Sequence, residues 1–382
     1  MWRRLLATVR DWDWPLFIFT ILLLCLGLAE LYSSSLSRPE IKDLFYHQLA
    51  VAGFGLVLMV VISAIDYRVY RSWARVIYLL MIIMLALALV FGLTIRGNAG
   101  WLRLGNFGFQ PVELVKFLSV IVLASFLSHV GPPLNTAKTI KAIIILLIPV
   151  VLVLAQPDFG SAFVLAASSG ALLVSLPKSR RWWLIMVGLA LAVALAGSFF
   201  LKGYQRDRLS VLINPQADPL GRGYNVTQSV IAVGAGGWTG RGLGLGTQSQ
   251  LKFLPEQHTD FIFSSIAEEL GAVGGILVLG LWAAFFIRIV WLLRRVRDDF
   301  AVLVTIGIFS IFAIQVGFNI GMNLGLLPVV GLTLPFVSYG GSSLLVSLAA
   351  IGLLFNLSRQ YGKSAPREAV GEIDRRGSTV IS

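Results

Sequence analysis

The chain has a single cysteine, Cys25, among its 382 residues, and only 13% of the residues are charged. A lone cysteine inside an apolar run excludes a disulfide framework and a paired-thiolate motif. The scarcity of charge, beside 57% hydrophobic residues, leaves far more apolar surface than one soluble core can bury. The basic residues are scattered over many short segments and form no single basic face, which argues against nucleic-acid binding. The composition therefore predicts an integral membrane protein.

The sequence also lacks a long internal repeat and a signal-peptide cleavage site, which narrows the possible kinds of membrane protein. We find no long internal repeat, which argues mildly against a transporter built from inverted repeats. The first apolar run follows basic residues, as a signal peptide would, but it is longer than one and lacks a small-residue cleavage site. We therefore expect it to be an uncleaved membrane anchor.

Apolar runs long enough to cross the hydrocarbon layer recur along the chain. We place ten, at about 14–34, 45–65, 73–94, 112–129, 140–155, 159–177, 182–201, 261–287, 301–325 and 336–357. Helices are expected because lipid offers backbone groups no water to bond. The predicted fold class is an all-α polytopic membrane protein, with residues 1–382 as one membrane domain.

Basic residues predict the orientation. With both termini in the cytoplasm, about two thirds of the 31 Lys and Arg residues fall on the cytoplasmic side, as the positive-inside rule requires. Residues 202–260 then form a large extracytoplasmic loop between the seventh and eighth helices, and 359–382 a cytoplasmic tail. We interpret the net charge of +12 as a consequence of the membrane topology, with its basic cytoplasmic loops, and as a source of attraction to anionic lipid headgroups.

The large loop contains two recognisable stretches. Residues 224–233 have helical apolar spacing and are expected to lie at the membrane interface. Residues 240–246 alternate glycine with other residues, like a phosphate-binding loop, but no strand precedes them, so the pattern is weak. Backbone N–H groups beside Arg241 and Lys252 remain candidates to hold a pyrophosphate.

An acid and a lysine lie in the first turns of the fourth run. Pro111 fits the first helical position, and Glu113 and Lys116 then fall on one helix face, where they can pair. A charge at bilayer depth costs about 2.5–3.5 kcal/mol, so such residues usually face a cavity or a partner. The pair is either a self-neutralising staple between segments or part of a functional cavity.

Two other carboxylates are expected on the same side. Asp158 follows Gln156-Pro157 at the start of the sixth run, and Asp260 precedes the eighth. Each could be only a favourable helix-dipole contact, but acids at three helix starts indicate a polar cavity that opens outward. Glu268 and Glu269, about two turns into the eighth run, lie too deep for ordinary surface charges.

Asp260 is the strongest candidate for chemistry. It lies in the polar, glycine-rich passage 234–271 and stands at the mouth of the run that begins Phe261-Ile262-Phe263. The simpler interpretation is that Thr259 or Asp260 caps this helix. The residues alone leave both interpretations open.

Three passages carry a resemblance to a known family. They are Leu254-Pro255-Glu256-Gln257-His258-Thr259-Asp260 with Glu268-Glu269-Leu270-Gly271; Trp101 and Arg103 with Gln110-Pro111-Val112-Glu113-Leu114-Val115-Lys116; and the proline- and glycine-rich stretch 323–343. Together they resemble the SEDS family of membrane proteins, which includes the rod-shape protein RodA and the division protein FtsW. Gln257 and the compact length are more like RodA. The resemblance covers essentially the whole chain to Ser343. The prolines and glycines of 323–343 break the helix, so this stretch is predicted to be a re-entrant loop.

The resemblance implies an activity and partners. It predicts a peptidoglycan glycosyltransferase of the bacterial cytoplasmic (inner) membrane that polymerises lipid II, the undecaprenyl-pyrophosphate-linked disaccharide-pentapeptide, at the outer face during cell elongation. It also implies a class B penicillin-binding protein as transpeptidase partner, other elongation-complex proteins, and a divalent cation, Mg²⁺ or Mn²⁺.

The residues are compatible with that chemistry. A donor linked α to pyrophosphate and a product linked β require inversion, so one base must take the proton of the acceptor hydroxyl; Asp260 is the predicted base. Lys116, Arg103, Arg241 or a cation held by Glu113, Asp158 or Asp260 could stabilise the leaving pyrophosphate. The further candidates to line the cavity are Gln228, Lys252, His258 and Ser338.

Two other functions fit the same residues. A lipid II flippase would need a polar path through both leaflets, and a scaffold would only hold its penicillin-binding partner. The inner halves of the predicted helices carry few polar groups, which favours an enzyme.

Overall fold

The structure is a computed structural model that describes residues 9–37, 41–95, 98–104, 107–131, 136–175, 222–250, 253–254 and 256–362. The seventh predicted helix, the first part of the large predicted loop and the tail after 362 lie outside the described residues. The predicted count of ten spanning helices and the limits of that loop therefore remain predictions.

Within the described residues, eight helices are long and apolar enough to cross a membrane. They are α2 (Trp14–Ser37), α3 (Lys42–Ala64), α5 (Ala74–Phe91), α6 (Pro111–Val130), α7 (Thr136–Ala155), α13 (Ile262–Leu293), α14 (Asp299–Asn323) and α15 (Gly341–Gly362). A shorter apolar helix, α8 (Phe159–Val174), matches the sixth predicted run. The chain is thus a polytopic helical membrane protein, as predicted.

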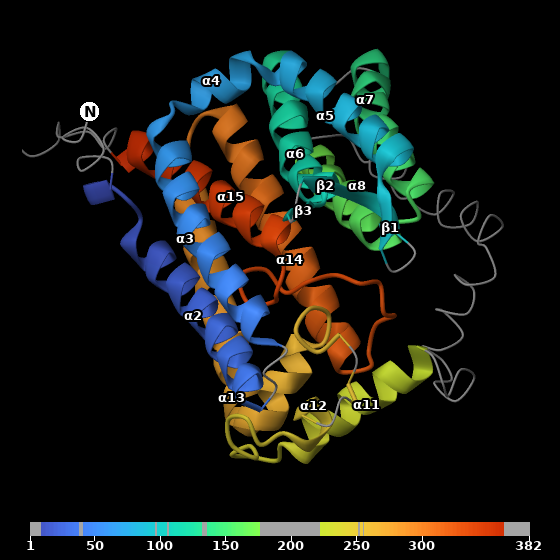
Figure 1. Ribbon diagram of the computed structural model, residues 1–382. Coiled ribbons are helices and arrows are strands. Elements are labelled where there is room, and N and C mark those ends of the chain that lie inside the picture. Colours follow the sequence, from blue (N-terminus) through green and yellow to red (C-terminus); the bar gives the residue numbers. More distant parts are fainter. Residues whose placement is uncertain are drawn as a thin grey trace, which may run out of the picture.

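Helix α14 runs through the middle of the arrangement. It contacts α6, α8, α13 and α15. Figure 1 shows α2, α3 and α15 together on one side of the molecule and α5 to α8 on the other. Three short helices complete the described elements: α4 (Tyr67–Ser72), α11 (Arg222–Ala235) and α12 (Thr247–Gln250). Helix α11 confirms the helix predicted at 224–233.

One small sheet accompanies the predicted helices. Between α5 and α6 the chain forms an antiparallel three-stranded sheet of β1 (Leu93–Ile95), β2 (Asn98–Leu104) and β3 (Phe107–Phe109). The Ala99 N–H donates to the Gln156 carbonyl at 3.3 Å, and the Gln156 side chain donates to the Leu85 carbonyl at 2.9 Å. The sheet is therefore fixed to the turn between α7 and α8 and, through Gln156, to α5.

The segment between α14 and α15 is irregular and lies deep in the protein. Phe336 is 2% exposed and packs against Trp282, Phe285 and Phe312, with ring centroids 5.4–5.9 Å apart. Its φ of +63° is incompatible with a helix. The last helix consequently begins at Gly341, where 336 was predicted, and the segment has the buried, irregular backbone expected of a re-entrant loop.

Helix α13 is broken at Gly271, where φ is +68° and ψ is −165°. A Cβ on Gly275 would lie 3.6 Å from the ring of Phe263. In a straight helix these two residues would be roughly 18 Å apart along the axis. Residues 262–270 and 272–293 are therefore two helices that meet at a sharp angle. Gly271 makes this turn, because its φ is positive.

Residues 236–242 supply the hydrogen bonds that the break removes. Ala272 and Val273 donate their N–H groups to the carbonyls of Gly237 and Trp238 at 2.8 and 3.2 Å. On the other side of the break, the carbonyls of Glu268 and Glu269 accept from the N–H groups of Arg241 and Gly242 at 3.1 and 3.0 Å. No backbone group is left without a hydrogen bond at these four positions, because the loop supplies the donors and acceptors that a continuous helix would have supplied.

We predict that Gly271→Ala destabilises the protein. A Cβ there would lie 2.3 Å from the Gly240 nitrogen, and the positive φ alone costs about 1–2 kcal/mol for a non-glycine residue. The matched control is Gly280→Ala in the same helix, where no atom lies within 4 Å and alanine favours the helix. Thermal unfolding of both variants in detergent or nanodiscs tests this. Equal melting temperatures would contradict the prediction.

Candidate functional site

The turn that carries Asp260 is held by its backbone carbonyls. The carbonyl of His258 accepts from the Tyr339 N–H at 2.7 Å. The next carbonyl, of Thr259, accepts from the Ser338 hydroxyl at 2.6 Å. Both donors belong to the irregular segment between α14 and α15, so this segment fixes the turn in place.

The carbonyl of Asp260 itself is held by two amides of α14. Asn319 and Asn323 each donate an Nδ2–H to it at 2.9 Å. Asn319 also donates to the carbonyl of Leu332 at 2.7 Å. Three successive carbonyls are thus bonded, and the carboxylate of Asp260 is carried on a rigid support.

A distant side chain contributes to the cap of helix α13. The helix begins at Ile262, and the side chain of Phe261 at the preceding position does not cap it. The side-chain oxygen of Asn323 accepts from the Ser264 N–H at 3.0 Å, which is the bond that a capping residue normally makes. The hydroxyl of Thr259 donates to Glu256. The bond to Ser264 is therefore made by Asn323, in α14.

Asp260 and the start of α8 lie on either side of residues 330–332. A Cβ on Gly331 would be 3.7 Å from the Asp260 Oδ2 atom, and one on Gly160 would be 2.6 Å from the Val330 carbonyl oxygen. Glycine at both positions permits this close approach of backbone to backbone and of backbone to carboxylate. The structure thus brings the first turn of α8 and the Asp260 turn together, as predicted.

Asp158 has a structural role at this junction. Its Oδ1 atom caps α8 by accepting from the Ser161 N–H at 3.0 Å. Its Oδ2 atom accepts from Asn98 at 2.7 Å and from Gln110 at 3.1 Å. The carboxylate therefore joins α8, the sheet and the start of α6.

Gln110 continues this network toward the last helix. Its N–H donates to the Ser342 hydroxyl at 3.0 Å, and the hydroxyls of Thr333 and Ser343 lie 3.2 Å apart. The starts of α6 and α8 and the Asp260 turn are consequently arranged around residues 330–343. The three predicted carboxylates share one end of the helix bundle.

The predicted pair between Glu113 and Lys116 is present. Lys116 Nζ lies 2.8 Å from Glu113 Oε1. Lys116 is fully buried, and Glu113 is 8% exposed. A desolvated pair of this kind is costly to break, because either partner alone would leave an uncompensated charge.

The depth of the Asp260 turn follows from α14. Asp298 caps its start and pairs with Arg71 at 3.6 Å, both on half-exposed side chains, which fixes one membrane edge. Asn319 follows about twenty residues later, or roughly 30 Å along the helix, which equals the thickness of the hydrocarbon layer. The turn held by Asn319 therefore lies at the opposite edge of the bilayer, at headgroup level.

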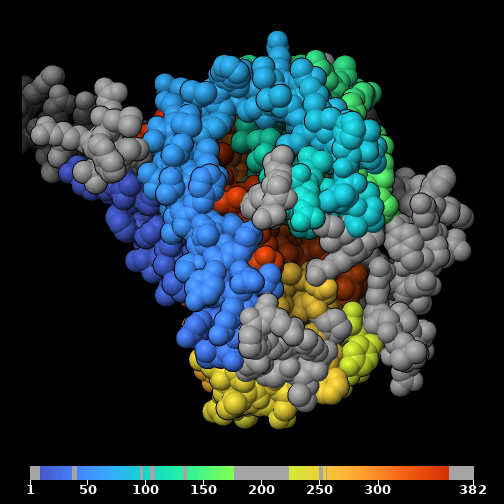
Figure 2. Space-filling view, viewed as in Figure 1, coloured from blue at the N-terminus to red at the C-terminus, as the bar shows by residue number. Residues whose placement is uncertain are grey.

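The surface is hollowed close to this place. Figure 2 shows a recess between α3 in blue, the sheet region in cyan and residues before α13 in yellow and gold, with orange and red C-terminal residues at its floor. The C-terminal third of the chain, which includes the segment that holds the Asp260 turn, thus lines the bottom of an open recess.

Comparison with known proteins identifies the family. The family model described as cell cycle protein, FtsW/RodA/SpoVE, matches residues 13–363. The chain belongs to this family.

Relatives and solved structures agree. The chain is 39% identical to peptidoglycan glycosyltransferase MrdB of Escherichia coli K12, over 91% of this chain and 94% of the relative. It is 37% identical to stage V sporulation protein E of Bacillus subtilis, over 91% and 97%. A solved peptidoglycan synthase complex, described as coordinating polymerization and crosslinking, contains a chain with a TM-score of 0.79 and 32% identity, over 92% and 98%. RodA of Thermus thermophilus gives a TM-score of 0.69 at 29% identity, over 92% and 97%.

The other candidates within this FtsW/RodA/SpoVE chain are placed as follows. Arg103 is exposed on β2, opposite Gly108. Gln228 is half-buried on α11, and Lys252 lies outside the described residues. Arg241 is exposed and donates through Nε to the Ala235 carbonyl at 3.2 Å.

The glycine-rich stretch is not a phosphate cradle at its first turns. The N–H groups of Arg241 and Gly242 already donate to α13, and that of Leu245 donates to the Gly242 carbonyl at 3.1 Å. These donors are not available to a pyrophosphate. The exposed side chain of Arg241 remains a candidate for that role, and Lys252 lies outside the described residues.

The described residues do not form a ready cation site. No group of three or more His, Cys, Asp and Glu side chains lies close enough together in this part of the chain. Glu113 is neutralised by Lys116, and both oxygens of Asp158 accept hydrogen bonds. The predicted metal candidates therefore do not fit a protein-built site, and we assign no chemical step to a cation.

Several residues of the site were missed from the sequence. Asn319 and Asn323 lie one turn apart in an apolar run, and buried amides at that spacing were the available signal. Glu30 was missed too: it is 3% exposed and accepts a hydrogen bond from Ser265.

Glu268 and Glu269 are buried as predicted, at 0% and 1% exposed. Glu268 accepts from the Gln248 N–H at 2.8 Å, and Glu269 accepts from the Ser33 hydroxyl at 2.7 Å. Together with the contact between Glu30 and Ser265, these bonds attach helix 262–270 to α2 and to the loop around α12.

We predict that Lys116→Met and Glu113→Gln each lower the melting temperature. Breaking a buried pair costs about 3–5 kcal/mol, because the remaining charge is left unpaired. The double variant should recover most of the loss, since no charge remains. A double variant that is as unstable as the sum of both single variants would contradict this account. Thermal unfolding of the three purified proteins measures it.

Proposed function

We propose that this protein is a peptidoglycan glycosyltransferase that polymerises lipid II at the outer face of the bacterial cytoplasmic membrane. The observation that carries the proposal is the Asp260 turn, whose three successive carbonyls are bonded by α14 and by the irregular segment before α15. That support leaves the carboxylate against Gly331 at the edge of the bilayer. Membership in the FtsW/RodA/SpoVE family supports the assignment, as do relatives named peptidoglycan glycosyltransferases.

Asp260 acts in this proposal as the general base. The acceptor hydroxyl attacks the anomeric carbon of the donor while Asp260 takes its proton. The bond from that carbon to the pyrophosphate oxygen breaks, and the configuration inverts. A rigidly held base suits this step, because positioned acid–base catalysis contributes about 10²–10⁴-fold to a rate.

The leaving pyrophosphate requires positive charge. Lys116 is close to the start of α6 but is paired with Glu113, which weakens its field. The exposed side chains of Arg103 and Arg241 are the other candidates. A divalent cation remains part of the proposal only as a separate prediction, because the described carboxylates do not assemble a site for it.

The orientation, the partners and the cellular role complete the proposal. The basic residues support cytoplasmic termini. A class B penicillin-binding protein is the proposed transpeptidase partner, within an elongation complex, and a solved neighbour is described as a synthase complex that couples polymerization with crosslinking. Similarity to MrdB and RodA favours elongation over division.

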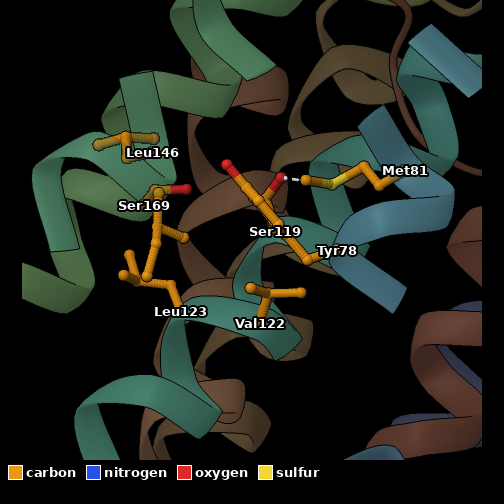
Figure 3. Close-up of a pocket in the computed structure, with 8 residues that line it drawn as sticks. Tyr78, Met81, Ser119, Val122, Leu123, Leu146 and Ser169 are labelled. Carbon is orange, nitrogen blue, oxygen red and sulfur yellow. Dashed lines mark hydrogen bonds between the residues drawn. The ribbon is translucent and has the colours of Figure 1, made fainter. Parts of the chain in front are cut away.

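A flippase is the second candidate, and the cavity between α5, α6, α7 and α8 argues against it. Figure 3 shows this cavity with the hydroxyls of Tyr78, Ser119 and Ser169 directed toward its interior. The space inside it is about 10 Å³, room for about one water molecule and far below the range of about 300–1,000 Å³ that is typical for small-molecule sites. This cavity is therefore too small to hold a disaccharide-pentapeptide.

Asp260→Asn tests the catalytic role. The exchange removes proton acceptance but keeps the size of the side chain, so polymerisation should fall by at least about 10²–10⁴. The melting temperature should barely change, because asparagine keeps the size of the side chain and caps a helix about as well as aspartate, and the two bonds to the backbone carbonyl are kept. The measurement is polymer formation from labelled lipid II by purified protein, beside thermal unfolding.

The matched control for this experiment is Glu256→Gln. It makes the same acid-to-amide exchange four residues earlier, on a half-buried side chain whose carboxylate accepts from Thr259. It should retain activity. Near-normal polymer from a stable, partner-bound Asp260→Asn variant would remove Asp260 from the mechanism and favour the flippase or the scaffold.

Polymer should also form without any nucleotide sugar. The proposed donor is the lipid-linked disaccharide, and no motif for a nucleotide fold was found in the sequence. Reconstituted protein given only lipid II, with and without added nucleotide sugars, provides the comparison. A strict requirement for a nucleotide sugar would contradict the proposal.

A further inference from the structure

The loop around the break in α13 carries large apolar side chains that face outward. Trp238 is 77% exposed, Leu243 59% and Leu245 67%. We name these three residues the outer apolar patch. An exposed cluster of this kind marks a contact surface for something apolar.

The loop cannot turn these side chains inward, because its backbone is pressed against helix 262–270. A Cβ on Gly236 would lie 1.9 Å from the Ala267 carbonyl oxygen, and one on Gly240 would lie 2.1 Å from that of Glu269. Glycine at these positions brings backbone against backbone. The larger side chains between and after them consequently point away from the protein.

The depth of the patch follows from α13. At one end of residues 272–293, the guanidinium groups of Arg288 and Arg295 lie 3.7 and 3.1 Å from the ring centroid of Trp291. Tryptophan beside basic residues is typical of a membrane–water interface. The N–H of Val273, bonded to the Trp238 carbonyl, lies about 18 residues away, or roughly 27 Å along the helix. That distance is close to the thickness of the hydrocarbon layer.

The surface next to the patch faces lipid. Val273, Ile276 and Leu277 are 60%, 62% and 50% exposed on a helix apolar enough to span the membrane. The patch continues this surface at its outer edge. In Figure 1, α11 and α12, which flank the loop, lie with the start of α13 at one end of the molecule.

We propose that the outer apolar patch inserts into the outer leaflet, with Trp238 at the interface between headgroups and acyl chains. The occupant is a lipid surface, because the patch lies at interfacial depth and is continuous with the lipid-facing side of α13. Trp291 on α13 and Trp238, whose carbonyl accepts from the Val273 N–H of the same helix, then mark the two edges of the bilayer. The loop becomes a membrane anchor that holds the break, and with it helix 262–270, at a fixed depth. The proposal does not depend on the catalytic one.

Site-specific fluorescence tests the proposal. Trp238→Cys, Leu243→Cys and Leu245→Cys are each made in a Cys25→Ser background and labelled with an environment-sensitive dye. The proteins are placed in nanodiscs of phosphatidylethanolamine and phosphatidylglycerol. Quenching is compared for a nitroxide high on the acyl chain, a nitroxide near its end, and iodide in water. Trp238→Cys keeps the backbone carbonyl that bonds Val273, and the two leucine positions carry the test if it fails to fold.

The chain provides one control position in the acyl interior and one in water. The native Cys25 is exposed in the middle of α2 and reports the acyl interior. Arg68→Cys, on the exposed start of α4, reports water.

We expect blue-shifted emission at all three patch positions, quenched most by the shallow nitroxide and little by iodide. Emission and iodide quenching equal to those of Arg68→Cys would overturn the proposal. A blue shift that appears only after a class B penicillin-binding protein is added would also overturn it, and would assign the patch to that partner.

Discussion

The arrangement of the site depends on hydrogen bonds between a short turn and an irregular segment that are far apart in the sequence. Residues 258–260 offer three successive carbonyls, and their donors come from residues 338–339 and from the last turns of α14. The irregular segment is fixed in turn by Phe336, which packs into the aromatic cluster of α13 and α14. A backbone without regular structure inside a membrane protein is stable only if every polar group finds a partner. Here the irregular segment bonds to the turn that carries Asp260. The same hydrogen bonds therefore stabilise the segment and position the residue of the proposed chemistry.

The break in helix α13 likewise serves both stability and the placement of the site at the membrane edge. The break at Gly271 separates a spanning helix, 272–293, from the short helix 262–270 that follows Asp260. The glycine-rich loop supplies the hydrogen bonds lost at the break, and buried glutamates attach the short helix to its surroundings. The short helix is thus held by polar contacts and by Ile262, Phe263 and Ile266, which are buried in the hydrophobic core. A carboxylate can therefore be presented at headgroup level while the rest of the helix crosses the bilayer.

Most of the polar residues singled out in the sequence have a structural partner. Glu113 is bonded to Lys116, and Asp158 caps α8 and joins it to the sheet. The turn at Asp260 is positioned by two bonds to the backbone carbonyl of that residue. The side chain that accepts from the Ser264 N–H near the start of α13 is Asn323.

The sequence by itself determined the membrane class, the positions of the long helices and the acids expected at one end, since long apolar runs and local helix starts are encoded by neighbouring residues. It also determined the ion pair of Glu113 and Lys116, because residues three apart share a helix face. Tertiary structure alone decided the cap from Asn323, the break at Gly271, the sheet β1–β3 and the use of the glycine-rich N–H groups. Each of these features depends on a partner that is distant in the sequence. The spacing of residues along the chain does not show which distant groups will form a hydrogen bond with one another.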